Sequence, residues 1–281
     1  MFLSNRPKMA DLPQTSHIRL DPRGAVLHLW LDRPERRNAL SSQMVREITA
    51  TFAAIAADRS VRIVVLRGVG GTFCAGGDIQ NMSLAQPAPR PDAPDELRDY
   101  NRRFGAALET VNAAPQVVIA AVEGYAMGGG FGLACVADIT IATADARFAL
   151  SEATIGVVAA AVSPFVVQRI GLPAARRLGV TAVRIDGAQA LDIGLADFVV
   201  RDGAALDAAI RETCNHALNC APEAIAVTKR LMLRAAGGDL VGQVLDDAAA
   251  SFAASVRGPE GREGTAAFVA KRKPSWVTQV E

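Results

Sequence analysis

The chain has 281 residues, of which 50% are hydrophobic and 21% charged, and its formal net charge is +1. This composition suits a large buried core, and the near-neutral charge argues against a nucleic-acid surface, which usually carries a basic excess. No apolar run reaches the roughly 20 residues of a membrane span, and the start has no apolar signal region, so we expect a cytoplasmic protein. We expect residues 1–16 to be a flexible extension, with Met1 or Met9 as the true start.

Strand-like and helix-like stretches alternate through most of the chain. Four apolar runs have the length of buried strands, over residues 25–31, 62–68, 116–122 and 138–143. The apolar spacing between them predicts helices near residues 42–58 and 96–112. This alternation predicts an α/β fold. Helix-like segments then follow one another, so we predict a core over residues 17–202 and a helical C-terminal region over 203–281.

The cysteines and histidines show no metal-binding pattern. The four cysteines are Cys74, Cys135, Cys214 and Cys220. Their spacing is not that of a metal site, and we expect them to be free thiols in a reducing compartment. The three histidines are scattered, so we predict no metal site.

Two glycine-rich stretches follow predicted buried strands. "VGGTFCAGGDIQNM" comes after residues 62–68, and "EGYAMGGGFG" comes after residues 116–122. Glycine permits close backbone approach, so two main-chain N–H groups that converge on one point would hold an oxyanion. The same spacing also fits glycines that only make tight turns and close packing. "GGGFG" does not match the dinucleotide fingerprint G-x-G-x-x-G, and neither stretch has the lysine of a phosphate-binding loop.

Four segments together resemble the crotonase (enoyl-CoA hydratase/isomerase) superfamily, and they occur in that family's order. They are "LDRPERRNAL", "FCAGGDIQNM", "VIAAVEGYAMGGGFGLACVADITIATADARFALSEATIGV" and "EGTAAFVAKRKPSW". The resemblance covers most of residues 25–275. It implies a crotonase-like spiral of repeated β-β-α units, with a helical C-terminal region that forms a homotrimer or a dimer of trimers.

The resemblance assigns catalytic roles to three residues. The backbone amides of Gly77 and Gly129 would hold the thioester oxygen, and Glu152 would be the general acid–base. The first of the two glutamates of well-known hydratases falls on Gly132, so that carboxylate is missing. A surface capping acid is the other interpretation of Glu152.

One carboxylate is compatible with more than one function. The resemblance favours addition of water to a 2-enoyl-CoA, which would make the protein an enoyl-CoA hydratase. A single glutamate also serves an isomerase that shifts a double bond between positions 3 and 2 of the acyl chain. A non-catalytic CoA-thioester-binding or RNA-binding protein is the third hypothesis.

Coenzyme A is expected as part of the acyl-CoA substrate and not as a separate cofactor. The resemblance implies that nine residues contact it, the last two often from a neighbouring subunit: Arg36, Arg37, Ala39, Ala75, Asp78, Ile79, Gln80, Phe268 and Lys271. An exposed basic loop fits Arg36 and Arg37 equally well. A helix N-cap fits Asp78, and an amphipathic terminal helix fits Phe268 and Lys271.

The segment "AVSPFVVQRIG" stands where many straight-chain hydratases carry a "PGAGGTQRL"-like sequence. It looks more like the branch that hydrates methylglutaconyl- or isohexenylglutaconyl-CoA. Such substrates carry a second carboxylate, and Arg98, Arg102 and Arg103 are candidates to bind it. A solvated helix face is the alternative for these three arginines.

Overall fold

The computed structural model describes residues 12–78 and 94–280. Two predicted coenzyme contacts, Ile79 and Gln80, lie outside the described residues, as do Met1 and Met9. Within those two ranges, no helix is long and apolar enough to cross a membrane, and no three His, Cys, Asp or Glu side chains are grouped to hold a metal ion.

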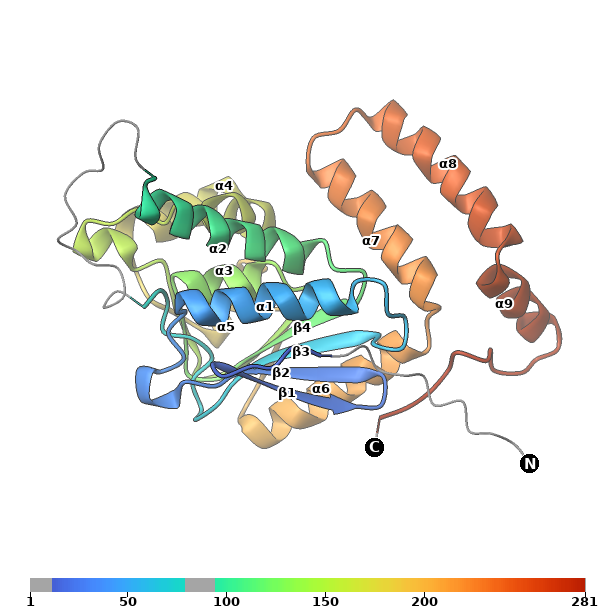
Figure 1. The fold of residues 1–281 in the computed structure, drawn as a ribbon, viewed down its shortest axis with the longest axis horizontal. Coiled ribbons are helices and arrows are strands. Elements are labelled where there is room, and N and C mark those ends of the chain that lie inside the picture. Colours follow the sequence, from blue (N-terminus) through green and yellow to red (C-terminus); the bar gives the residue numbers. More distant parts are fainter. Residues whose placement is uncertain (1–11, 79–93, 281) are drawn as a thin grey trace.

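A six-stranded sheet forms the centre of the fold (Figure 1). Its strands, in spatial order, are β1 (Ile18–Arg23), β2 (Val26–Leu31), β3 (Ile63–Gly68), β4 (Val117–Val122), β6 (Ile139–Thr143) and β9 (Phe198–Val200). β1 pairs antiparallel with β2, and the other neighbouring pairs are parallel. β1 is absent from the sequence prediction, because its residues "IRLDPR" are mostly polar and half-exposed.

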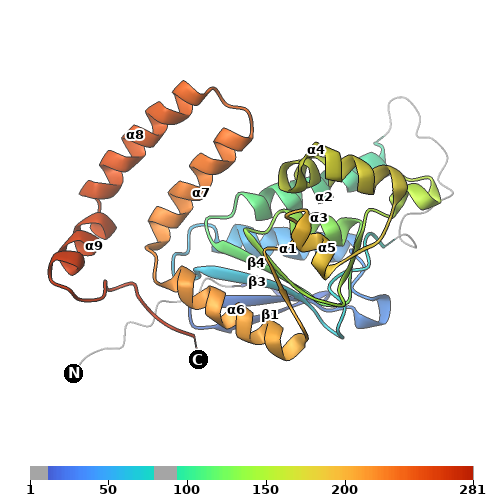
Figure 2. The same cartoon turned by 180° about the vertical axis from the view of Figure 1, so that it is seen from behind.

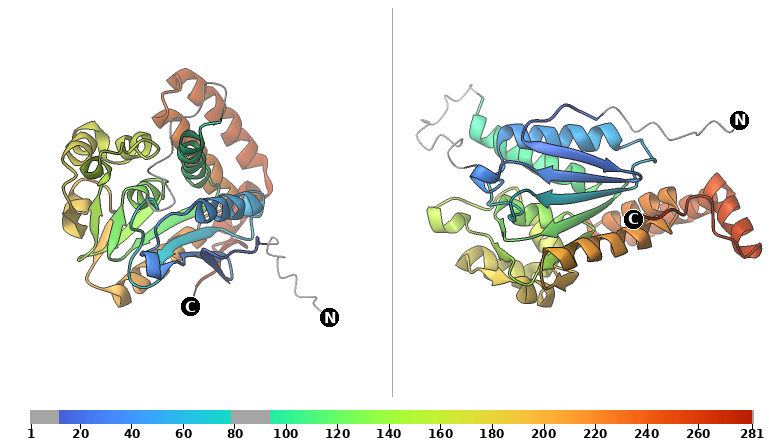
Figure 3. Two further views of the ribbon diagram at one scale, coloured as in Figure 1. Left: turned by 60° about the vertical axis from the view of Figure 1, so that its left-hand side comes forward. Right: turned by 90° about the horizontal axis from the view of Figure 1, so that it is seen from below.

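Helices cover both faces of this sheet, because successive residues of a buried strand point to opposite sides. The face that carries Leu27 and Val64 is covered by α1 (Ser42–Ile55), α2 (Glu96–Asn112) and α3 (Gly129–Cys135). The opposite face, which carries Val26 and Ile63, is covered by α6 (Gly203–Leu218). Seen from below, α6 runs along the sheet toward the C-terminal helices (Figure 3).

A second, three-stranded sheet adjoins the first. It contains β5 (Tyr125–Met127), β7 (Arg147–Ala149) and β8 (Ile185–Asp186). The short turns η1 (Pro34–Arg36) and η2 (Glu152–Ile155) and the helices α4 (Ser163–Thr181) and α5 (Gly187–Asp192) complete the core. The successive units β1-β2-α1, β4-β5-α3 and β6-β7-α4 each place two strands before a helix, which confirms the predicted β-β-α fold.

Three helices project from the core as an arm, visible from both sides in Figures 1 and 2. They are α7 (Pro222–Ala236), α8 (Val241–Arg257) and α9 (Pro259–Val269). Neither α7 nor α8, both fully within the described chain, contains a buried residue. The arm instead exposes large apolar side chains, among them Met232, Leu245, Phe252 and Phe268.

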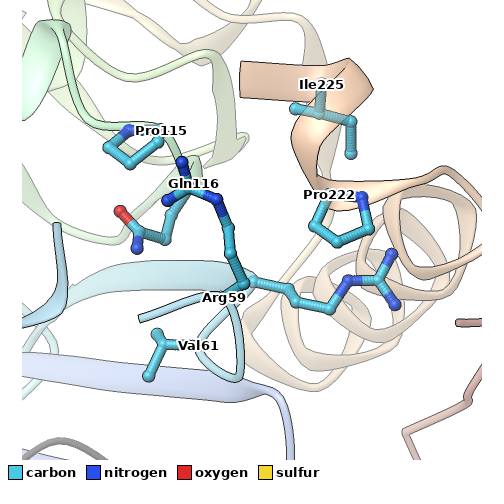
Figure 4. A pocket seen from close by; sticks show the side chains of 7 residues that line it. Arg59, Val61, Pro115, Gln116, Pro222 and Ile225 are labelled. Carbon is cyan, nitrogen blue, oxygen red and sulfur yellow. The ribbon is translucent and has the colours of Figure 1, made fainter. Parts of the chain in front are cut away.

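Arg62 connects the C-terminal tail to the core. Its guanidinium donates hydrogen bonds to the backbone carbonyl groups of Trp276, Ala217 and Cys220. Beside it, a cleft of about 10 Å³ separates Gln116 from Pro222 at the start of α7 (Figure 4). That volume holds about one water molecule, so the cleft is a packing seam.

We predict that Arg62→Met lowers the free energy of unfolding by about 3 kcal/mol, because three carbonyl groups lose a buried, charged donor. Urea denaturation measures the loss, and hydrogen exchange should show that residues after α9 open first. The matched control is Arg59→Met, whose ion pair with Glu223 is exposed and should contribute less than about 1 kcal/mol. Equal denaturation midpoints for the two variants would contradict the anchoring role of Arg62.

Candidate active site

Three parallel segments end side by side at one edge of the core. β5 and β7 pair with Met127 opposite Ala149, and Cys74 forms a parallel bridge with Ala126. The N–H of Cys74 donates to the carbonyl of Tyr125 at 2.7 Å, and the N–H of Met127 donates to the carbonyl of Cys74 at 2.9 Å. Since parallel strands present their carboxyl ends at the same edge, the chain that follows each segment is brought to one place.

Glycines let the two glycine-rich turns touch. A Cβ atom on Gly76 would lie 3.2 Å from the carbonyl oxygen of Met127, and one on Gly130 would lie 2.6 Å from the Cβ of Cys74. Gly128 has a φ of 48°, a conformation that side chains other than glycine rarely adopt. Close packing is therefore the reason for Gly130, while Gly128 is required by its backbone conformation.

The backbone amides of Gly77 and Gly129 belong to residues that line one cavity. Opposite Gly77, Leu40 donates to the carbonyl of Gly76 at 2.8 Å and accepts from the N–H of Asp78 at 3.1 Å. This parallel pattern leaves the Gly77 N–H on the side away from Leu40. Gly129 is the first residue of α3, so its N–H has no acceptor within the helix. Among the described residues, neither N–H has a hydrogen-bond acceptor.

The cavity has a volume of about 550 Å³ and a mostly apolar lining, which is typical of a small-molecule site. The two glycine turns, α2 and the chain from Ser151 to Val162 form its walls. Glu152 is its one charged lining residue in the part of the chain that the structure describes. An anionic group bound here therefore meets no cationic side chain among the described lining residues.

Glu152 begins η2, shortly after the end of β7, and its carboxylate lies against Gly128. A Cβ on Gly128 would be 2.6 Å from Glu152 Oε1. Glu152 Oε2 is buried and has no hydrogen-bond partner in the described chain. Burial raises the pKa of Glu152 above its ordinary value, and a backbone hydrogen bond opposes this only in part. Such a carboxyl group suits general acid–base chemistry.

Two side chains that sequence reasoning missed hold the chain on both sides of the bridge between Leu40 and Gly77. Arg33 Nη1 donates to the Asp78 carboxylate at 2.9 Å and to the carbonyl of Ala39 at 2.8 Å. Tyr100 of α2 donates its hydroxyl hydrogen bond to the carbonyl of Leu40 at 3.1 Å. Arg33 and Asp78 are 45 residues apart and Tyr100 and Leu40 are 60 apart, so no local spacing indicates these two contacts.

The sequence profile of the family described as "Enoyl-CoA hydratase/isomerase" matches residues 21–279. The chain belongs to the enoyl-CoA hydratase/isomerase family. Among solved structures, Pseudomonas aeruginosa AtuE is 50% identical, with a TM-score of 0.88 over 94% of this chain and 100% of that one. An enoyl-CoA hydratase/isomerase from Marinobacter aquaeolei is 45% identical, with a TM-score of 0.89 over 93% and 99% of the two chains.

A named enoyl-CoA hydratase is also similar in sequence to this family member. "Enoyl-CoA hydratase ACTT6" of Alternaria alternata is 34% identical over 280 residues, which cover 95% of this chain and 89% of the relative. The predicted family and crotonase-like fold are therefore confirmed.

The structure brings four of the predicted site residues of this family member to the cavity lining: Ala75, Gly77, Gly129 and Glu152. Arg36 and Arg37 lie exposed at η1, and Asp78 is buried in its ion pair with Arg33. Phe268 and Lys271 are exposed at the end of α9, which Figures 1 and 2 place at the far side of the molecule from α2 and α4. The predicted coenzyme contacts of these residues and of Ala39 stay predictions.

The three arginines considered for a second substrate carboxylate do not line the cavity. Arg98 pairs with Asp99 and Arg102 pairs with Glu109, both at 3.2 Å, and Arg103 is also exposed. α2 turns another face inward, as helical spacing requires. That face carries Leu97, Tyr100, Asn101 and Phe104. The exposure of all three arginines agrees with the solvated-face interpretation.

Val162 occupies the space beside the position of the missing glutamate. A Cβ on Gly132 would collide with Val162 Cγ1 and lie 3.1 Å from Val162 Cβ. Leu108 stands 3.5 Å away on another side. Both Gly132 and Val162 are buried, so an apolar contact stands where the resemblance would place the first glutamate.

We predict that Gly132→Glu alone lowers the free energy of unfolding by about 3 kcal/mol or more, because it overpacks a buried site and adds a charge there. Adding Val162→Ala should restore at least half of this loss, since it removes the colliding methyl groups. Thermal unfolding of both variants, with Val162→Ala alone as the control, tests this. A Gly132→Glu protein as stable as the original would show that the space is not filled.

Proposed function

We propose that the protein adds water across the double bond of a 2-enoyl-CoA. The observation that carries this proposal is the Glu152 carboxylate packed against Gly128, directly beside the Gly129 amide. The amides of Gly77 and Gly129 would accept the thioester oxygen as its negative charge grows. One such donor contributes roughly 3 kcal/mol of transition-state stabilisation.

Glu152 performs both proton transfers in this proposal. Its ionised carboxylate takes a proton from water while the water oxygen bonds to the β carbon. The electron pair of the double bond moves toward the thioester, whose enolate oxygen is held by the Gly77 and Gly129 amides. Glu152 then returns the proton to the α carbon, which gives a 3-hydroxyacyl-CoA. A raised pKa suits the second step, because it makes the protonated form a ready donor.

The second candidate is an isomerase that converts a 3-enoyl-CoA into a 2-enoyl-CoA. The observation that favours it is the contact of Gly132 with Val162, since Glu152 is then the one carboxylate on the cavity lining in the described chain. A single carboxyl group carries a proton from the α carbon to the γ carbon, and no water is added. The product therefore distinguishes the two candidates.

The proposal includes the assembly and the coenzyme contacts. The large apolar side chains on the arm support a homotrimer, since exposed apolar patches of this kind mark protein interfaces. Arg36 and Arg37 are exposed, and the Arg37 carbonyl accepts from the N–H of Ala75, close to Gly77; this supports contacts of their guanidinium groups with coenzyme phosphates.

Glu152→Gln should lower the turnover of crotonyl-CoA by about 100-fold or more, the range of one general acid–base group. Loss of the enoyl absorbance measures the rate, and chromatography identifies the 3-hydroxyacyl product. Binding of coenzyme A should be unchanged. The matched control is Glu109→Gln, an exposed carboxylate on α2, which should keep full activity.

Two results would contradict the hydratase proposal. Conversion of a 3-enoyl-CoA with no hydroxyacyl product would establish the isomerase instead. Full activity of Glu152→Gln would remove Glu152 from the chemistry.

The rate of hydration should rise with pH through a pKa above the ordinary glutamate value of 4.5, because water addition needs the ionised form and burial favours the protonated one. A pH profile of kcat/KM measures this rise in rate, which Glu152→Gln should lack.

The same raised pKa affects stability. The proton bound to Glu152 stabilises the fold below the raised pKa, and this stabilisation is lost as pH rises through it. At about pH 8, Glu152→Gln should therefore unfold no more easily than the original; a less stable variant contradicts this.

A further inference from the structure

A second apolar cavity, of about 330 Å³, adjoins the active-site cavity. The two cavities share Val157, Val158 and Ala159 in their linings. Val158 is 75% exposed, so it stands at an open lip between them and not in a closed wall. A flexible chain bound in the first cavity therefore has a short path into the second.

A single segment of the chain, the one around η2, lies between the two cavities. Ser151 and Glu152 line the active-site cavity, whereas their neighbours Leu150 and Ala153 line the second. Glu152 and part of the wall of the second cavity thus belong to the same short segment. What binds in the second cavity lies on the other side of this short segment from the Glu152 carboxylate.

α4 forms the other side of the second cavity. The helix bends at Gly171, where φ is 71° and ψ is 159°, and both halves contribute to the lining. The lining residues from α4 are Ser163, Val166, Val167, Ala175, Arg176, Gly179 and Val180. Arg176 is the one charged lining residue in the described chain, and it is exposed. The surface offered is therefore mainly apolar.

We propose that the second cavity binds the far end of a long or branched apolar acyl chain whose thioester lies at Gly77 and Gly129. This rests on the proposed function and names its substrate class. The support is the shared lining, the apolar character of both cavities, and volumes that each fall in the range of ligand sites. A four-carbon acyl group fits in the first cavity alone and leaves the second one unused.

Gly179 allows the second cavity to be filled without touching the first. It lines only the second of these two cavities, and a Cβ there would have Leu150 Cδ1 as its nearest neighbour, at 3.9 Å. Leucine at this helical position is therefore accommodated, and it replaces the volume that the acyl chain would take. The matched control is Arg177→Leu, an exposed position on the same helix that lines neither cavity.

Gly179→Leu should lower kcat/KM for trans-2-dodecenoyl-CoA by at least about tenfold and leave that for crotonyl-CoA within about twofold, since each buried methylene contributes about fourfold in affinity. Arg177→Leu should leave both values unchanged. Equal kcat/KM ratios for the two substrates in Gly179→Leu and the original protein would overturn the proposal. A second result would also overturn the proposal: Gly179→Leu changes the oligomeric state, measured by light scattering, but does not change the chain-length preference. A second copy of the chain would then cover this cavity.

Calorimetry with saturated acyl-CoAs separates this proposal from the proposed function, because it needs no turnover. Lauroyl-CoA should bind the original protein more tightly than butyryl-CoA, and Gly179→Leu should weaken only the binding of lauroyl-CoA. This pattern together with no turnover of any 2-enoyl-CoA would support the acyl-chain site and reject the hydratase. Turnover of crotonyl-CoA with no dependence of binding on chain length would do the opposite.

Discussion

The site depends on main-chain contact between two turns that are far apart in sequence. The bridge between Cys74 and Ala126 fixes one turn against the other, and the register of β5 with β7 adds the chain that carries Glu152. Hydrogen bonds between backbones determine these positions, so they tolerate little drift. A side chain on Gly76 or Gly130 would push the turns apart. Close packing of the two turns is therefore what requires these glycines. The exposure of the backbone amides is a consequence of that packing.

The same arrangement places stability and chemistry in opposition. Glu152 is half-buried, and its buried Oε2 has no hydrogen-bond partner among the described residues, which disfavours the charged form. A protein selected only for stability would place a neutral or apolar group there. Gly132 is an example of such an apolar position, because Val162 packs directly against it. The proposed acid–base role of Glu152 is what would offset this cost.

The sequence predicts the parts of this molecule that have strong local signals. The apolar runs of β3 and β4 lie where they are predicted, and α2 spans Glu96–Asn112 as its spacing indicates. β1 and the bent helix α4 have no such signal, because one is largely polar and the other contains Gly171 and a proline. Charge alone also does not tell which face of α2 is buried. The Gly77, Gly129 and Glu152 assignments come from resemblance, and the structure supplies their common cavity.

The chain from Leu150 to Val162 allows chemistry and selectivity to vary separately. Its first part carries Glu152 and is tied to β7, whereas residues 157–162 form neither helix nor strand. Substitution in this later part changes the cavity walls at Val157, Val158 and Val162 without altering the bridge at Cys74. The Gly77 and Gly129 amides and the Glu152 carboxylate can then stay fixed while the cavity changes shape.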